Sequence, residues 1–536
     1  MHSFSSSFTC SLTDFKLKSI TTNTPEEIQK NGSQRLVAYN AFFNQIGDGN
    51  VISTISLLLN FLLDALTQPF LTKHCLQQSL ALWSLLCHNA HTSRVLVTLP
   101  LIQDVVVHHS TLHLASTLAP DTLRFRPLFY ASLTEVLLLR AVPGDLERFC
   151  APFATTITTL LSSPCTLQSM ETLVVCLRDI TGVLRACTSS YHYMTLLELL
   201  CTQSLQAIQN YLPQFWNNSS FVVSSFRFCA EVSQDRKQRV DTDDPSPRVT
   251  LTFKAIASIF SSYCQLVVDS LPANRNTRQL FSLDVMKSIQ LIFHTLELQL
   301  DGKYIPFGAM LYYQDNSLLE LIHTLTRMVR PYELTDLLQT PKTAERVFGF
   351  LKELFKSYML VVSLLPNEDF VFFVQLILSG LGCENDTVVR LSSSALESLA
   401  TFFYTNQLVQ TPMMGRLRQF IGNPSLFWSP LVQELFDILL FTKTSMQWNL
   451  ASALLPVCLV YENGITEYCN YLCEGCSEEG VTEIRHVFQE IAKKVDRSLD
   501  ASAKEEFNMC LTNWIRRITK YAIQRNEISR VCSTRT

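Results

Sequence analysis

Apolar residues along this chain recur at helical spacing, and the pattern restarts about every twenty to thirty residues at a helix-start signal. Two segments show it most clearly, 285–300 with Val285, Ile289, Ile292, Phe293, Leu296 and Leu300, and 484–499 with Ile484, Val487, Phe488, Ile491, Val495 and Leu499. Spacings of i, i+3, i+4 and i+7 predict amphipathic helices that pack on neighbouring helices. We find no sustained two-residue alternation, so the pattern favours an all-α fold.

The length and composition of the chain narrow the choice of fold further. A chain of 536 residues is too long for one ordinary hydrophobic core, which leaves several domains or one repeat array. Hydrophobic residues make up 47% and charged residues 17%, enough to bury an extensive interior. Only 15 residues are glycine, which disfavours turn-dense β folds and parallel α/β folds with glycine-rich loops.

Charge and cysteine usage bear on partners and compartment. The net charge is −4 and the pI about 6.3. The sequence shows no basic face of the kind that nucleic-acid binders carry, although a local basic patch is compatible with this net charge. We therefore expect no nucleic-acid partner. The 17 cysteines are scattered within apolar helical runs, as Cys176 is between Val175 and Leu177, which indicates free buried thiols in a reducing cytosolic or nuclear compartment.

Neither a leader nor a membrane span is evident. Residues 1–24 are rich in Ser and Thr and lack the apolar core of a signal peptide. A transmembrane helix needs roughly 20 consecutive apolar residues, and the stretches at 51–63, 199–226 and 370–383 are too short or too polar. We expect no membrane insertion; soluble expression without detergent would exclude a multi-pass membrane protein.

Helix-start signals suggest how the helices are arranged. They are Thr24-Pro25-Glu26-Glu27, the capping box of Ser317 with Glu320, Thr340-Pro341, Asn367 and Ser429-Pro430. These starts are separated by about the length of one helix and a turn. Such short connections make consecutive helices antiparallel neighbours. Two such helices form a unit of roughly 40 to 47 residues, the HEAT/armadillo period. We expect a HEAT/armadillo-like superhelix (α-solenoid), although a globular helical bundle would give the same local signals because no consensus recurs at a fixed offset.

The array is expected to have few interruptions. We predict a disordered tail at 1–24, a HEAT-like array at 25–520, and a helix end with a tail at 521–536. The segment 233–249 is charged and contains prolines, so we expect an exposed, mobile loop. A shorter polar break runs from Pro272 to Arg278.

Three cysteines offer the best alternative chemistry. Cys469, Cys473 and Cys476 have the C-x3-C-x2-C spacing of iron–sulfur radical enzymes that use S-adenosylmethionine. Glu474 stands where those enzymes usually carry an aromatic residue, and the motif lies late in a helical chain. Zinc held by these thiols and His486 is a second alternative, and we disfavour both.

Other groups resemble sites only loosely. His109 and His113 are one helical turn apart with His108 beside them, yet zinc would need a third ligand and no H-E-x-x-H is present; we expect structural histidines, as for His88 and His91. Further weak matches are the acidic run Asp241, Asp243 and Asp244, the turn Gly47-Asp48-Gly49, the sequons at Asn31, Asn217, Asn218 and Asn385, and the aromatic group Phe215, Trp216 and Phe221. We therefore predict no catalytic, cofactor-binding or metal-binding residues, no cofactor and no enzyme activity.

Four segments, in order, resemble the exportin-7 (Ran-binding protein sixteen) family of importin-β (karyopherin) transport receptors. They are Phe129 to Leu133 after Arg124 and Arg126, Leu173 to Gly182, Phe307 to Leu318, and Gln447 to Leu455. Phe307 to Leu318 is the most specific, with a Phe-Gly…Leu-Tyr…Asp…Leu pattern. The resemblance runs from about Arg35 to Lys520, and exportin-4 and Ran-binding protein seventeen would match in much the same way.

The resemblance implies a nuclear export receptor that shuttles between nucleus and cytoplasm. Such receptors bind protein cargo together with the GTPase Ran in its GTP form and cross the nuclear pore on Phe-Gly nucleoporins. Cargo and Ran affinities would be reciprocally coupled. The family's main Ran contact lies in N-terminal repeats that we expect to be missing here, through a truncated gene model, a split gene or a shortened paralogue. Cargo-binding and Ran-binding residues stay unassigned, and a helical-repeat scaffold independent of Ran is the alternative function.

Overall fold

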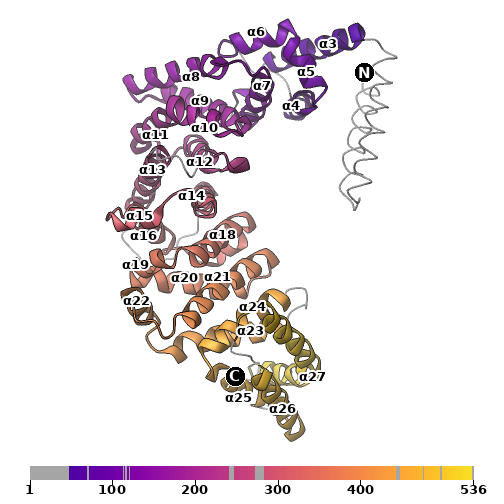
Figure 1. Ribbon diagram of the computed structural model, residues 1–536, viewed down its shortest axis with the longest axis vertical. Coiled ribbons are helices and arrows are strands. Elements are labelled where there is room, and N and C mark those ends of the chain that lie inside the picture. The colour runs from indigo at the N-terminus through magenta and orange to yellow at the C-terminus, as the bar shows by residue number, and fades with distance from the viewer. Residues whose placement is uncertain are drawn as a thin grey trace. The chain divides into compact units, whose positions relative to one another are not determined.

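The computed structural model describes residues 48–533, with gaps at 69–71, 113, 115–116, 120, 241–246, 272–282, 333, 442–446, 475 and 495–497. Within these residues the chain is helical and contains no strand (Figure 1). It forms two compact units, Met1–Phe125 with Glu135–Ala141, and Arg126–Thr134 with Val142–Thr536. The predicted tail at 1–24, the start signal at Thr24-Pro25 and the break at 272–278 lie outside the described residues.

The smaller unit is a run of short helices. It contains α3 (Asp48–Thr67), α4 (Lys73–His88), α5 (Thr92–Thr98), α6 (Pro100–His108), η2 (Leu123–Phe125) and the end of α7 (Arg126–Leu139). Each of α3 to α6 packs on the next. Leu59, Leu66, Leu80 and Trp83 are completely buried between them, as their helical spacing requires.

Two layers of helices make up the larger unit. The first layer contains α9 (Leu167–Ala186), α12 (Ser219–Ser233), α14 (Leu283–Gly302), α18 (Pro341–Ser357), α21 (Asp386–Thr405), α24 (Gln447–Val460) and α27 (Ala501–Ser533). The second contains α8 (Asp145–Ser162), α11 (Thr202–Phe215), α13 (Arg248–Ser270), α16 (Ser317–Val329), α20 (Asn367–Leu381), α23 (Pro424–Phe441) and α25 (Asn463–Cys473). Each helix packs on the next member of its layer, and α26 (Glu478–Lys494) joins α25 to α27. This is the stacking of an all-α helical-repeat solenoid, as the sequence predicts.

Shorter elements connect the layers. They are α10 (Ser190–Leu196) with the π-helical turn η3 (Leu197–Cys201), η4 (Arg236–Gln238), α15 (Phe307–Tyr312), α17 (Leu334–Gln339), α19 (Met359–Leu364) and α22 (Pro412–Ile421). They lengthen the repeats: first-layer helices start at residues 167, 219, 283, 341, 386, 447 and 501, so successive starts are 45 to 64 residues apart. The predicted period of 40 to 47 residues is therefore too short for most units.

Hydrogen bonds between first-layer helices fix their direction. Arg178 donates to Ser224, which is 46 residues later, and Arg185 approaches Glu231 at the same offset. Between α12 and α14 the linked pairs are 65 and 66 residues apart: Ser219 with Asp284, and Ser233 with Gln299. Because each offset is nearly constant along a pair of helices, α9, α12 and α14 run parallel.

The two segments with the clearest apolar pattern form helices. In α14 Ile289, Ile292, Phe293, Leu296 and Leu300 are buried, and in α26 Ile484, Val487, Phe488 and Ile491 are buried. The first prediction is confirmed. The second extends too far, because α26 ends at Lys494 and Leu499 lies in the connection to α27.

The predicted helix starts have mixed outcomes. Thr340 precedes α18 with Pro341 at the first helical position, and Asn367 begins α20, as predicted. Ser317 is not the cap of α16; Asp315 accepts hydrogen bonds from its amide and hydroxyl instead. Ser429-Pro430 begins no helix, since α23 already starts at Pro424.

The segment 233–249 is less exposed than its charge suggests. Ser233 ends α12 and is buried, and Arg239 is 1% exposed. Arg239 donates to the carbonyls of Leu184, Cys187 and Glu231 and lies 4.2 Å above the Tyr193 ring. The expectation of an exposed loop is therefore wrong for Arg239, because helix-end carbonyls satisfy its charge inside the protein.

One described helix, α13, is long and apolar enough to cross a membrane by length and composition alone. Its residues Phe253, Ile256, Phe260 and Tyr263 are buried, and the helix packs on α11 and α16. The buried core helix of a repeat array can have the same length and apolar composition, so α13 is only weak support for a membrane span.

Candidate functional site

The three clustered cysteines lie at the end of α25. Cys469 is buried and accompanies Cys473 on the helix, while Cys476 donates a hydrogen bond to the carbonyl of Leu472. Burial, reinforced by neighbouring Cys473, raises the pKa of the Cys469 thiol to about 12. The three thiols are not among the groups of described residues whose potential metal-ligand atoms lie within 4.8 Å of one another, so the geometry gives no support to the iron–sulfur or the zinc interpretation. His486 instead faces α27, where Arg517 approaches it at 3.1 Å.

The predicted histidine positions are engaged in local structure. His88 bonds to Ser84 and lies 3.1 Å from Glu135, and His108 bonds to Asp104 on its own helix. His109 is buried. His91 immediately precedes α5, and His113 lies outside the described residues.

The remaining weak matches also have structural roles. Asn218 and Asn385 of the sequons accept backbone hydrogen bonds at the starts of α12 and α21. Phe215 packs on Phe221 at a ring distance of 6.3 Å, which confirms a corner between α11 and α12. Asp48 and Gly49 begin α3, so the predicted turn there is wrong. Asn31, Asp241, Asp243 and Asp244 lie outside the described residues.

A charged cluster that the sequence did not reveal joins α16 to α20. Asp369, fully buried, accepts from Arg330 at 2.7 Å and lies 2.8 Å from Nδ1 of His323, and Arg330 also donates to Glu368. Among the described residues this is the one group of three or more potential metal ligands whose atoms lie within 4.8 Å of one another. The guanidinium of Arg330 already donates hydrogen bonds to both carboxylates, so the cluster is best explained as a link between repeats. The bonded partners on α16 and α20 are 38 to 46 residues apart in sequence, which hides the cluster from motif inspection.

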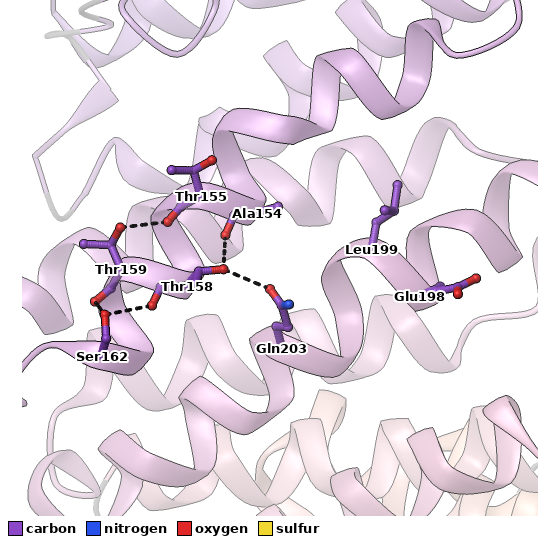
Figure 2. A pocket seen from close by; sticks show the side chains of 8 residues that line it. All are labelled: Ala154, Thr155, Thr158, Thr159, Ser162, Glu198, Leu199 and Gln203. Atoms are coloured by element: carbon purple, nitrogen blue, oxygen red, sulfur yellow. Dashed lines mark hydrogen bonds between the residues drawn. The ribbon is translucent and has the colours of Figure 1, made fainter.

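A shallow groove of about 480 Å³ lies between α8 and α11 (Figure 2). Threonines of α8 line one wall, and their hydroxyls donate to carbonyls one turn earlier, as Thr158 does to Ala154 and Thr159 to Thr155. Gln203 and Glu198 line the other side, and Glu198 pairs with Arg248. These eight lining residues include no nucleophile with an adjacent base, so the groove offers no catalytic arrangement.

The segments that carry the family resemblance are mainly packing elements. Arg126, the first residue of α7, and Asp179 of α9 form a buried pair with two hydrogen bonds of 2.7 Å. Burial alone would lower the pKa of Arg126, but the Asp179 carboxylate raises it above its usual value. Gly182 lets α9 approach α7 closely, because a Cβ there would lie 2.5 Å from the carbonyl oxygen of Pro127. Tyr312 and Tyr313 of the third segment are, by contrast, about 80% exposed.

Comparisons with known proteins give one consistent result at the sequence level. The chain is 21% identical to exportin-7-B of Xenopus laevis over 451 residues, which cover 79% of this chain and 41% of the relative. It is 21% identical to human Ran-binding protein 17 over 73% of this chain and 37% of that protein. Drosophila melanogaster Ran-binding protein 16 matches 82% of this chain and 42% of its own length, again at 21% identity.

Other comparisons add little. No family model matches the sequence. An engineered protein of known crystal structure aligns with 86% of this chain at 11% identity and a TM-score of 0.35, too weak a likeness to support an argument. The chain spans about two fifths of the length of the exportin-7 relatives it matches. It is a homologue of exportin-7 and Ran-binding proteins 16 and 17 over about four fifths of its own length, consistent with the exportin-7 family.

Proposed function

We propose that this chain acts as a nuclear export receptor of the karyopherin type, or as part of one. The observation that carries the proposal is the similarity to exportin-7 and the Ran-binding proteins over about four fifths of the chain. The two-layered solenoid supports it, because stacked repeats offer the extended surfaces that such receptors use to bind proteins. In this function the chain only binds other proteins. The nucleotide is bound and hydrolysed by its partner, Ran.

The proposed partners are protein cargo, Ran in its GTP form and Phe-Gly nucleoporins. Export then requires that Ran-GTP and cargo each tighten the binding of the other by the same factor. The receptor would shuttle between nucleus and cytoplasm. Because the chain matches about two fifths of its relatives, each of these properties is to be tested on the chain itself.

Binding to immobilised Ran loaded with GTP or GDP tests the proposal. We expect a clear preference for the GTP form, with human Ran-binding protein 17 as a parallel sample. Equal binding to both forms, or binding to neither, would contradict a Ran-dependent receptor. Recovery of a stable protein complex from cells without any nucleotide dependence would favour the alternative, a helical-repeat scaffold.

A further inference from the structure

The groove between α8 and α11 has one wall made of hydroxyl groups (Figure 2). Its members are exposed residues of α8 at spacings of i, i+3, i+4 and i+7, namely Thr155, Thr158, Thr159 and Ser162. Residues with this spacing share one face of a helix. Leu199 of η3 and Gln203 of α11 line the other side, so two helices enclose the volume of about 480 Å³.

The hydroxyl groups offer acceptors to the groove. A hydroxyl has one hydrogen and two lone pairs. Thr155 donates its hydrogen to the carbonyl of Ala151 at 3.0 Å, and Thr159 donates to that of Thr155 at 2.9 Å. Thr158 likewise donates to Ala154 at 2.8 Å. The lone pairs that these bonds leave over can accept hydrogen bonds from a ligand, so the wall favours a ligand with N–H donors.

The spacing of these acceptors matches an extended polypeptide. Residues four apart on a helix lie about 6 Å apart along its axis, as Thr155 and Thr159 do. In an extended chain every second N–H points to the same side, at intervals of about 6.6 Å. An extended segment that lies along α8 can therefore donate to successive hydroxyl oxygens.

The segments that form the groove are poor in charge. Residues 149–170, which include most of α8, and 199–226, which include α11, contain no charged residue, although charged residues make up 17% of the chain. Glu198 is the one charged residue among the eight that line the groove, and it pairs with Arg248 at 3.2 Å. Protein interfaces are depleted of charged residues at their centre. A charged ligand would lose water here without gaining a free counter-charge, so an uncharged one fits better.

The wall opposite the hydroxyl groups is an irregular helix. α10, η3 and α11 follow one another without a break from Ser190 to Phe215, and η3 is a π-helical turn. Such turns are rare and often lie at functional sites. This one carries Glu198 and Leu199, which both line the groove. The irregularity therefore coincides with the groove and supports a binding role for it.

We propose that the groove between α8 and α11 binds an extended, uncharged segment of a partner protein, which donates backbone N–H groups to the hydroxyl oxygens of α8. From Thr155 to Ser162 the wall is roughly 10 Å long, which accommodates about three residues of such a segment. This binding does not depend on Ran, so it goes beyond the export proposal.

The first test uses a phage-displayed library of random heptapeptides. It is selected on the purified chain without Ran and counter-selected on the double variant Thr155→Val, Thr159→Val, so failure here and failure of the export proposal are separate results. We expect enrichment of peptides without Lys, Arg, Asp or Glu. The most enriched peptide, labelled and measured by fluorescence anisotropy, should bind saturably and equally well at low salt and at about 1 M salt, because no ion pair is involved.

Variants of the chain and of the peptide then locate the contacts. The double variant should bind the selected peptide about tenfold more weakly, because two hydrogen bonds are lost. Thr172→Val with Thr482→Val is the matched control, since both threonines are exposed, donate to a carbonyl four residues earlier and lie outside the groove. A copy of the peptide with N-methylated backbone amides should lose at least as much affinity. Equal thermal unfolding of all variants would show that they fold.

Several results would overturn the proposal. They are no enrichment against the double variant, an equal loss in the control pair, or full affinity of the N-methylated peptide. Selection of peptides rich in arginine or lysine, whose binding weakens with salt and in Glu198→Gln, would also overturn it and would assign the groove to a cationic ligand.

Discussion

The ion pair of Arg126 with Asp179 and the lysine Lys287 of α14 place a positive charge in the larger unit in two different ways. Arg126 and Asp179 are buried together with two short hydrogen bonds, and Glu231 satisfies two arginines at once. Lys287 finds an amide and other cations instead. The ion pairs link neighbouring helices, whereas Lys287 forms no ion pair within 4.0 Å among the described residues.

The difference follows from burial. A charge removed from water must be paired or hydrogen-bonded, or it destabilises the fold. Buried Arg126 has a carboxylate partner, whereas buried Arg178 and Arg239 donate to a hydroxyl and to backbone carbonyls. A charge at the surface can stay unneutralised at a small cost, and that residual potential is available to a partner. Removing charges from each region should therefore have opposite effects on stability.

The largest effect is expected from Asp179→Ala. It leaves Arg126 buried without its carboxylate, which should cost about 3–5 kcal/mol of local stability. Native-state hydrogen exchange in α9 is the suitable measurement, because a long repeat array need not unfold in one step. Arg126→Met combined with Asp179→Leu should recover most of the loss. A single-variant loss below about 1 kcal/mol would mean that the pair contributes little.

Gly182→Ala tests the backbone approach that supports this pair. The new Cβ would lie 2.5 Å from the Pro127 oxygen and 2.8 Å from Cβ of Tyr130, so α9 must shift, at about 1–3 kcal/mol. Gly308→Ala in α15 is the control, since nothing lies within 4 Å of its Cβ and alanine favours a helix. Equal hydrogen-exchange protection in α9 of wild type and Gly182→Ala would show that the close approach is not required.

Much of the fold was predictable because it depends on local patterns. The apolar spacing of 285–300 and the Thr340-Pro341 start both correspond to observed helices. Arg239 was misjudged because a charged residue near prolines usually faces water, and the helix-end carbonyls that bind it come from Leu184 and Cys187, more than fifty residues earlier. Ser429-Pro430 was misjudged because a second start signal, Asn423-Pro424, precedes it.

The His323 cluster was beyond sequence reasoning for a different reason. His323 of α16 and Arg330 at its end lie 38 to 46 positions before their partners on α20. To predict which distant residues meet, one must know how each repeat is aligned with the next. Connecting elements such as η3 and α15 change the repeat length each time, so this alignment cannot be read from a constant offset. Without a recurring consensus, that alignment appears only in the folded protein.

Asp369→Asn should change the pH dependence of stability. Burial raises the pKa of Asp369 more than His323 and Arg330 lower it, so the folded state holds this proton more tightly than the unfolded chain. Acidification from that raised pKa toward 3.8 therefore adds stability, by at most about 1.4 kcal/mol per pH unit. The variant lacks this contribution and should lose stability more steeply on acidification. Glu368→Gln, at an exposed neighbour, is the control, and parallel curves for Asp369→Asn and wild type would contradict the assignment.

The smallest effect is expected at Lys287. Lys287→Gln removes one of several mutually repelling cations, so it should stabilise the larger unit by about 0.5 kcal/mol at low salt, the opposite sign to Asp179→Ala. The gain should vanish near 1 M salt, where the Debye length is about 3 Å. Lys356→Gln should change little under either condition. If Lys287→Gln instead destabilises the protein at low salt, an anionic group within the chain already neutralises Lys287, and the distinction between the two regions fails.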